Sequence, residues 1–172
     1  MVTINQLYNI MPNGGKRIDP FVEPLNAAMA EFSINTPARQ AAFIAQIAHE
    51  SGEFRYVEEI ASGAAYEGRK DLGNTQAGDG KKFKGHGLIQ VTGRANHKAC
   101  GEALGLDLIT NPRLLCDPLH AARSAAWFWH SRGLNKLADA GDFRAITKRI
   151  NGGFNGLKDR ELYHARAKKY IL

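Results

Sequence analysis

The sequence has only two cysteines among its 172 residues, Cys100 and Cys116, so it has neither a disulfide framework nor a cysteine-based zinc site. The two thiols can pair or stay free, and reduced, partly buried thiols are the simpler expectation. The histidines are scattered and never take the H-E-x-x-H spacing of a helical zinc site. They are His49, His86, His97, His120, His130 and His164. We therefore expect no metal and no cofactor.

Long apolar runs are also missing. No segment approaches the ~20 apolar residues that a membrane-spanning helix needs. The first residues, MVTINQLYNIMPNGGKR, have neither the basic start nor the apolar centre of a secretory signal. We therefore expect synthesis in the cytoplasm, so that a target outside the membrane is reached by another route.

Acidic residues are scarce in the last fifty residues. Residues 1–122 carry 12 Lys and Arg against 13 Asp and Glu, whereas residues 123–172 carry 11 against 4. The excess behind the net charge of +6 therefore lies at the C-terminal end. It favours an acidic polymer or surface as partner, such as nucleic acid, cell-wall polymer or lipopolysaccharide; a solvated basic helix face explains it equally well. Because no base-reading helix or stacking motif accompanies it, we expect no nucleic-acid partner.

Helical patterns dominate a chain that is long enough for one compact domain with two lobes around a cleft. Capping residues and apolar periodicity predict helices over 4–11, 19–32, 37–50, 95–104, 118–132, 143–150 and 157–170. The run Leu88–Thr92 between glycines predicts a small β-element, and residues 60–82 a long loop beside a cleft. In the row Trp127-Phe128-Trp129, at least one ring must point away from the main core. We expect a single, mainly α domain over 1–172.

The most informative stretch runs from Thr36 to Glu59. Thr36 is a good N-cap and Pro37 fits the first helical position, and the residues after them are apolar nearly all round, as in a buried helix. The helix ends by presenting His49 and Glu50. A carboxylate there faces the negative end of the helix dipole, and if the site is also apolar both effects favour its protonated form. Because a general acid needs its proton, Glu50 is the candidate catalytic acid.

A second carboxylate is required if the chemistry is the hydrolysis of a glycosidic bond. Inverting glycosidases hold two carboxyl groups about 6.5–9.5 Å apart, with room for a water between base and sugar. Glu59 could lie across a cleft from Glu50 at such a distance, whereas Glu53 is too close in sequence. Glu58 and Glu67 remain alternatives to Glu59. On spacing alone, an acidic surface is the commoner explanation for all of these residues.

Three motifs follow one another along the chain. They are AHESGEFRYVEE, GDGKKFKGHGLIQVTGRANH and ITKRINGGFNGLKDRELYHARAKKY. Together they resemble glycoside hydrolase family 19, the chitinase family, and look most similar to its short bacteriophage endolysins. The resemblance covers roughly residues 36–170 and implies a helical, lysozyme-like, two-lobed fold with substrate lying in the cleft.

The resemblance also implies roles for individual residues. It makes Glu50 the general acid and Glu59 the base that activates water, with inversion at the anomeric carbon, and Thr92 helps to hold that water. It implies substrate contacts for His49, Gln90, Asn96, Asn151 and Arg160. Amides suit sugar hydroxyls, and an arginine beside the acidic pair keeps a carboxylate ionised as a base.

Each of these polar residues has a structural alternative. Asn151 stands before two glycines and could end a helix, while Gln90 and Thr92 could be ordinary strand residues. Asn96 could cap a helix, and Arg160 could be one of many surface cations. Because three motifs occur in register, we favour the functional interpretation.

Two residues depart from the family pattern. Glu53 stands where the family often has Gly, and we expect it to add a third carboxylate near the acid. His86 stands where the family often has Arg, and we expect it to change a sugar contact. The chain is also shorter than plant chitinases and shows no separate sugar-binding or wall-binding module, which points to the endolysin branch.

The resemblance therefore implies a phage endolysin that hydrolyses β-1,4 glycosidic bonds of bacterial peptidoglycan, as a lysozyme or muramidase does. We expect a monomer that binds glycan strands, contacts anionic envelope components through its basic C-terminal region and reaches the periplasm after a holin permeabilises the membrane. One alternative is a chitinase acting on N-acetylglucosamine polymers. An alternative of another class is a non-catalytic, basic cell-wall-binding module.

Overall fold

The computed structural model describes all 172 residues and is mainly helical. The α-helices are α1 Ile4–Ile10, α2 Val22–Glu31, α3 Pro37–Glu50, α4 Asp79–Lys82, α5 Arg94–Leu104, α6 Pro118–Ser131, α7 Leu134–Asp139, α8 Phe143–Asn151 and α9 Leu157–Ile171. Short 3-10 turns lie at Gly15–Arg17, Asp19–Phe21, Ala64–Tyr66, Lys70–Leu72 and Pro112–Cys116. The predicted helical class is confirmed, and the predicted helix bounds are close to those observed.

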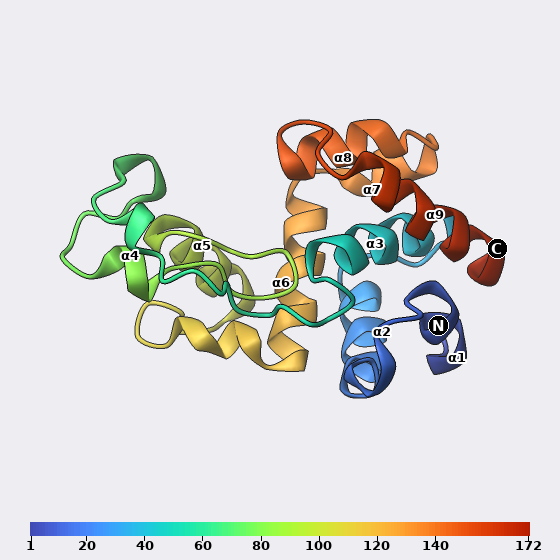
Figure 1. The fold of residues 1–172 in the computed structure, drawn as a ribbon, viewed down its shortest axis with the longest axis horizontal. Coiled ribbons are helices and arrows are strands. Elements are labelled where there is room, and N and C mark those ends of the chain that lie inside the picture. Colours follow the sequence, from blue (N-terminus) through green and yellow to red (C-terminus); the bar gives the residue numbers. More distant parts are fainter.

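The helices form two lobes with separate apolar cores (Figure 1). One lobe contains α1, α2, α3, α7, α8 and α9, whereas the other contains α4, α5 and the segments around them, and α6 stands between the two. The first lobe has a core of 31 buried residues. The second has a small core made of Val91, Cys100, Leu104, Leu108 and Leu115. The two-lobed arrangement is therefore the one that the sequence predicts.

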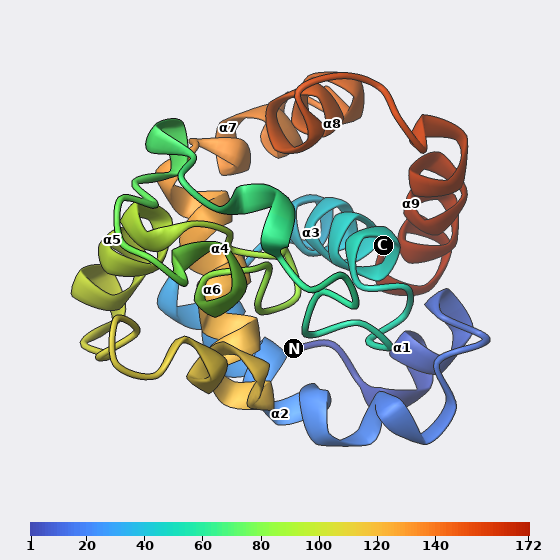
Figure 2. The ribbon, with the colours of Figure 1, turned by 60° about the vertical axis from the view of Figure 1, so that its left-hand side comes forward.

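Helix α3 is the central element of the larger lobe. The Thr36 hydroxyl accepts a hydrogen bond from the Arg39 backbone N–H, and Pro37 takes the first helical position, as predicted. Every residue from Ala41 to Ala48 is buried. Helix α9 packs along α3 and continues to α1, so the C-terminal helix joins the first segment of the chain (Figure 2). Full burial of a side chain such as Phe43 stabilises the fold by about 1.5–3 kcal/mol.

The predicted β-element is reduced to two isolated bridges, Glu58 with His86 and His86 with Val91. His86 and Val91 exchange backbone hydrogen bonds of 3.0 and 2.8 Å around a tight turn. The turn needs left-handed backbone at Gly87 (φ +87°) and Gln90 (φ +52°). Leu88 and Ile89 lie in this turn, and their side chains are buried in the larger core. Their burial therefore outweighs their preference for extended backbone.

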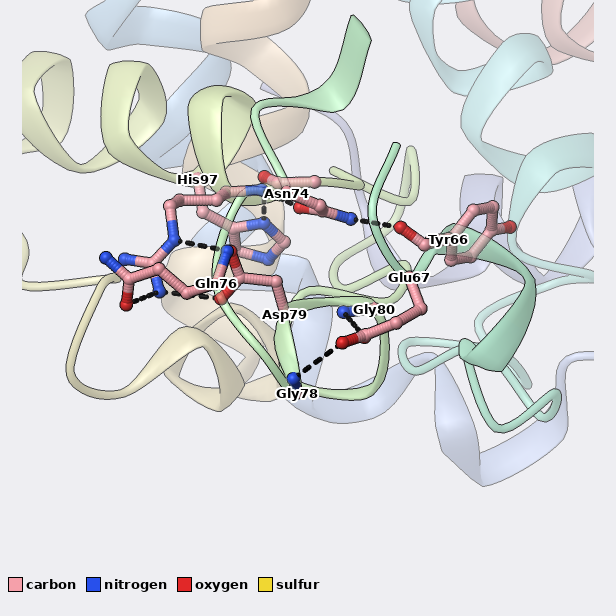
Figure 3. A network of polar contacts seen from close by, with 10 residues as sticks. Tyr66, Glu67, Asn74, Gln76, Gly78, Asp79, Gly80 and His97 are labelled. Atoms are coloured by element: carbon pink, nitrogen blue, oxygen red, sulfur yellow. Dashed lines mark hydrogen bonds and ion pairs between the residues drawn. The ribbon is translucent and has the colours of Figure 1, made fainter. Parts of the chain in front are cut away.

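The loop at residues 60–82 is ordered by polar contacts rather than by an apolar core (Figure 3). Two hydrogen bonds of 2.6 and 2.8 Å join the Arg94 guanidinium to Asp79, which is buried, and the guanidinium holds the pKa of Asp79 below its usual range. The buried Asn74 side chain accepts from the Arg94 backbone N–H and donates to the carbonyl of Tyr66, each at 2.8 Å. These contacts attach the loop to the first turn of α5.

Both cysteines are free thiols. Cys100 is buried in the smaller core, and burial raises its pKa to about 12. Cys116 is partly buried, with its Sγ 3.5 Å from the carbonyl of Val57. No helix has the combination of length and apolar composition that crossing a bilayer requires.

Candidate active site

Glu50 is the last residue of α3, and its side chain is 21% exposed. Its Oε1 lies 2.6 Å from Nη2 of Arg160 on α9, which is only 1% exposed. The other carboxyl oxygen has no protein partner. The surroundings are therefore polar on one side: a buried guanidinium fixes one oxygen and leaves the other available.

Arg160 is itself held by further hydrogen bonds. Its Nη1 donates to Oε1 of Gln46 at 2.6 Å, and its Nε donates to the carbonyl of Asn155 at 3.2 Å. The Gln46 amide in turn donates to the hydroxyl of Thr147 on α8 at 2.9 Å. The side chains of Arg160, Gln46 and Thr147 are all buried. Because a buried cation must be paired and hydrogen-bonded, this network sets the orientation of Glu50. Arg160 thus contacts the candidate acid, not the candidate base.

Glu59 has surroundings of a different kind. Its Oε1 accepts from the hydroxyl of Tyr66 and its Oε2 from the backbone N–H of Gly85, each at 2.9 Å. No cation contacts this carboxylate; the nearby Lys84 amine donates instead to the Glu59 carbonyl at 3.0 Å. The hydrogen bond to the Glu59 carboxylate raises the pKa of Tyr66, so the phenol keeps its proton and remains a donor. Two neutral donors therefore orient Glu59.

Glu58 is engaged by cations. Its two oxygens lie 3.1 Å from Nζ of Lys84 and 3.2 Å from Nη2 of Arg113. These contacts, that of Lys84 first, hold the pKa of the Glu58 carboxyl below its usual range. A carboxylate paired in this way is poorly suited to take a proton from water, so the geometry favours Glu59 over Glu58.

Glu67 stabilises a turn of the loop through its carboxylate (Figure 3). Its two oxygens accept from the backbone N–H groups of Gly78 and Gly80 at 2.7 and 2.8 Å. A Cβ on Gly80 would lie 2.5 Å from the backbone nitrogen of Glu67, so only glycine allows this approach. Both oxygens are occupied by this turn, and the geometry favours Glu59 over Glu67 too.

Glu53 is buried in the interior, with 3% exposure, so it is not open to a substrate; its place near the acid stays a prediction. Its Oε1 accepts from the hydroxyl of Tyr163 at 2.7 Å and from the amide of Asn13 at 3.3 Å, while Oε2 has no partner. Burial and the Glu53 carboxylate raise the pKa of Tyr163. The side chain therefore links α9 and the N-terminal segment to the residues that follow α3.

His86 is also buried, with 1% exposure, so its own side chain does not reach a sugar. Its Nδ1 lies 3.0 Å from Nε2 of His97, whose Nδ1 donates to the carbonyl of Gly93 at 2.9 Å. Burial lowers the pKa of both imidazoles, that of His97 to about 4. The pair is neutral near pH 7 and joins α5 to the turn after Gly85.

Gln90, Thr92 and Asn96 come together in one pocket of about 150 Å³. The hydroxyl of Thr92 donates to the carbonyl of Gln90 at 2.9 Å, and the amide of Asn96 donates to the carbonyl of Thr92 at 2.8 Å. The other lining residues are Leu72, Ile89, Val91, Trp127, Phe128 and Arg132. The structure thus places three predicted site residues on one wall and the end of α6 on the other.

The row of aromatic residues in α6 could have identified this second wall. Trp129 is buried in the larger core, while Trp127 packs against the smaller core and Phe128 against the larger. Trp127 and Phe128 also line the pocket. A row of three aromatic residues in one helix indicates that at least one ring points away from the main core. The roles of Tyr66 and Gln46 have no comparable signal, since their contacts join residues that no local pattern connects.

His49 and Asn151 lie outside this pocket. The His49 Nδ1 lies 2.6 Å from Oδ2 of Asp159, and its ring lies against Gly156, where a Cβ would be 2.3 Å from Cε1. Asn151 ends α8 and accepts from the backbone N–H of Asn155 at 3.3 Å. Both side chains shape the connection from α8 to α9; their substrate contacts remain predictions.

Comparison with known proteins gives the family. Residues 25–140 match the glycoside hydrolase family 19 model, described as chitinase class I. A glycosyl hydrolase family 19 domain-containing protein of Haemophilus influenzae is 28% identical over 95% of this chain and 93% of its own length. Endochitinase At2g43590 of Arabidopsis thaliana is 36% identical over 86% of this chain. The chain spans between 38% and 58% of the length of the Arabidopsis endochitinases that it matches.

A solved structure gives the same fold. The crystal structure of chitinase C from Streptomyces griseus HUT6037 aligns with 99% of this chain and 76% of its own, with a TM-score of 0.82 at 23% identity. The lysozyme-like helical fold that the motifs imply is therefore confirmed. The chain belongs to glycoside hydrolase family 19, the chitinase class I family, and is a glycoside hydrolase.

Proposed function

We propose that this glycoside hydrolase is a phage endolysin that cleaves the β-1,4 bonds of bacterial peptidoglycan with inversion. The observation that carries the reaction is the contrast between two carboxylates. Glu50 has one oxygen on the Arg160 guanidinium and the other without a partner. Glu59 is oriented by Tyr66 and Gly85, with no cation on its carboxylate. Two carboxylates in unlike surroundings are what a division into acid and base requires. The family resemblance, not this contrast, assigns the acid to Glu50 and the base to Glu59.

The steps follow from these surroundings. The free oxygen of Glu50 gives its proton to the glycosidic oxygen as the bond to the anomeric carbon breaks. Glu59 takes a proton from a water that attacks this carbon from the opposite face, and the hydroxyl of Thr92 positions that water. As Glu50 becomes a carboxylate, the Arg160 guanidinium at 2.6 Å stabilises the charge that develops. Each proton transfer of this kind contributes about 10²–10⁴-fold.

The choice of peptidoglycan over chitin is supported by charge. Chitin is uncharged, whereas peptidoglycan carries carboxylates on its lactyl groups and stem peptides. Helices α8 and α9 and the turn that ends α6 present exposed cations that pair with no carboxylate of the chain. They are Arg132, Arg144, Lys148, Arg149, Lys158, Lys168 and Lys169. A surface of this kind attracts an acidic polymer and gains nothing from a neutral one.

Product analysis tests this function. Wild-type protein should release new reducing ends from purified peptidoglycan faster than from chitin oligomers, and mass spectrometry of these ends identifies the bond. Glu50→Gln should abolish release from both. Activity confined to chitin oligomers would favour the chitinase alternative, which the names of the endochitinase relatives support. Clearing of permeabilised Gram-negative cells by Glu50→Gln at the wild-type rate would favour the non-catalytic binding module.

Access to the wall is part of the proposal. The chain acts as a monomer on glycan strands, after a holin has permeabilised the membrane between cytoplasm and periplasm. The basic C-terminal region then contacts anionic envelope components. Neutralising Arg166, Lys168 and Lys169 should therefore weaken lysis of cells more than hydrolysis of soluble glycan fragments, and an equal loss on both substrates would refute this contact.

A further inference from the structure

An arginine without an acidic partner lines the pocket that Gln90, Thr92 and Asn96 share. Arg132 follows the last residue of α6, and its Cζ lies 3.5 Å from the centre of the Phe128 ring. Its side chain makes one hydrogen bond within the protein, from Nη1 to the hydroxyl of Ser131 at 3.4 Å. The ring therefore positions a guanidinium whose other N–H groups remain available.

The charge of the pocket favours an anion. No acidic residue lines it, and Arg132 is the one charged residue that does. A second guanidinium lies behind it, because Nη1 of Arg149 donates to the carbonyl of Arg132 at 3.1 Å, and Arg149 pairs with no carboxylate either. A guanidinium over an aromatic face still offers its edge to a planar acceptor, and the acceptor that matches its fork is a carboxylate.

We propose that Arg132 binds a carboxylate carried by an N-acetylmuramic acid residue of the glycan strand. The inference rests on the proposed function, because peptidoglycan brings this carboxylate to the pocket and chitin does not. The carboxylate is the lactyl group itself where the strand has no peptide, or an acidic group of the stem peptide where the peptide is attached. Arg132 then selects the acidic sugar polymer at a pocket that also contains Thr92.

The test measures binding to the inactive Glu50→Gln protein, so that hydrolysis does not interfere. The probe is a tetrasaccharide of alternating N-acetylglucosamine and N-acetylmuramic acid without peptide, titrated by calorimetry. The comparison probe is the same oligomer with its carboxyl groups converted to methylamides. Arg132→Gln should weaken binding of the acidic oligomer about tenfold, as loss of one charge-assisted hydrogen bond does, and leave the methylamide unchanged.

Arg17→Gln is the matched control. Arg17 is another exposed arginine without a carboxylate partner, with one hydrogen bond from its Nη2 to the carbonyl of Asn13 at 2.6 Å, and it does not line the pocket. This substitution removes the same charge and should leave both affinities unchanged. Arg132→Lys, which keeps the charge without the fork, should lie between wild type and Arg132→Gln.

The outcomes separate the inference from the proposed function. The inference is overturned if the protein with Arg132 intact binds the acidic and the methylamide oligomers equally well, both with and without stem peptide. An equal loss on both forms in Arg132→Gln overturns it too, since that loss would be structural. An effect seen only with peptide-bearing oligomers assigns the carboxylate to the peptide. The proposed function fails on a different readout, when wild-type protein releases no reducing ends from peptidoglycan.

Discussion

The backbone between Glu50 and Glu59 is held in an unfavourable conformation, and Glu53 is the residue at which this can be measured. Gly52, Glu53 and Phe54 are consecutive and all have left-handed backbone, with φ of +56°, +57° and +64°. Glycine takes this region freely, whereas other residues lose about 1–2 kcal/mol there. The family preference for Gly at position 53 therefore has a physical reason, and this chain uses Glu instead.

Two substitutions separate the backbone effect from the side-chain effect. Glu53→Ala removes the hydrogen bonds to Tyr163 and Asn13, a loss of about 1.5–3 kcal/mol for a charged acceptor, and keeps the strain. Glu53→Gly removes the same hydrogen bonds and also relieves the strain. We therefore expect the free energy of unfolding of Glu53→Gly to be about 1–2 kcal/mol higher than that of Glu53→Ala, and both to be lower than that of wild type.

Urea unfolding, monitored by circular dichroism, measures this difference. The midpoints can be compared only if the two variants have equal m-values. Each variant is the control for the other, because they differ only in one methyl group. If Glu53→Ala is as stable as Glu53→Gly, the backbone at this position is unstrained and the reasoning is refuted.

Three further predictions follow from the site. Arg160→Met should destabilise the fold by about 3–5 kcal/mol, because it leaves Glu50 and Gln46 without their buried partner. The double variant with Glu50→Gln should lose less stability than the sum of the two single losses. Additive losses in urea unfolding would contradict the coupling. Tyr66→Phe should lower kcat about tenfold with KM unchanged, since it removes one of the two donors that orient Glu59, and steady-state kinetics on soluble glycan checks it. Burial depresses the pKa of both His97 and His164 to about 4, so each contributes stability that is present above the unfolded value near 6.5 and is lost as pH falls toward 4, by up to about 3 kcal/mol each. Urea midpoints at pH 7 and pH 4.5 measure the summed loss, and an unchanged midpoint would contradict it.

Features that depend on local sequence could be predicted. The bounds of α3 follow from Thr36, Pro37 and an apolar run, all of which act within the helix. The pattern of Leu88–Thr92 predicts extended chain, but Gln90 takes left-handed backbone because the turn buries Leu88 and Ile89 in the larger core. Burial of this kind is set by the whole fold and cannot be read from a five-residue pattern.

Contacts between distant residues could not be predicted from the residues alone. Arg160 is far from Glu50 in the sequence, and only the packing of α9 along α3 brings the two side chains together. Glu53 and His86 resemble cleft residues in the sequence because polar side chains are usually exposed, yet each has a buried partner, Tyr163 and His97. Glu58 and Glu67 could be set apart from Glu59 only once their cations and backbone donors were known.

Glu50 and Glu59, the candidate acid and base, are positioned by different kinds of structure, which has a consequence for distant residues. Helices hold Glu50, through Arg160. Glu59 depends instead on a loop: Tyr66 donates to it, and Asn74 holds the Tyr66 carbonyl and accepts from the Arg94 backbone N–H at the start of α5. This series of hydrogen bonds of 2.8 to 2.9 Å links the start of α5 to the Glu59 carboxylate. We therefore expect changes at Asn74, which is buried and has no hydrogen bond to Glu59, to affect catalysis through Glu59 rather than through Glu50.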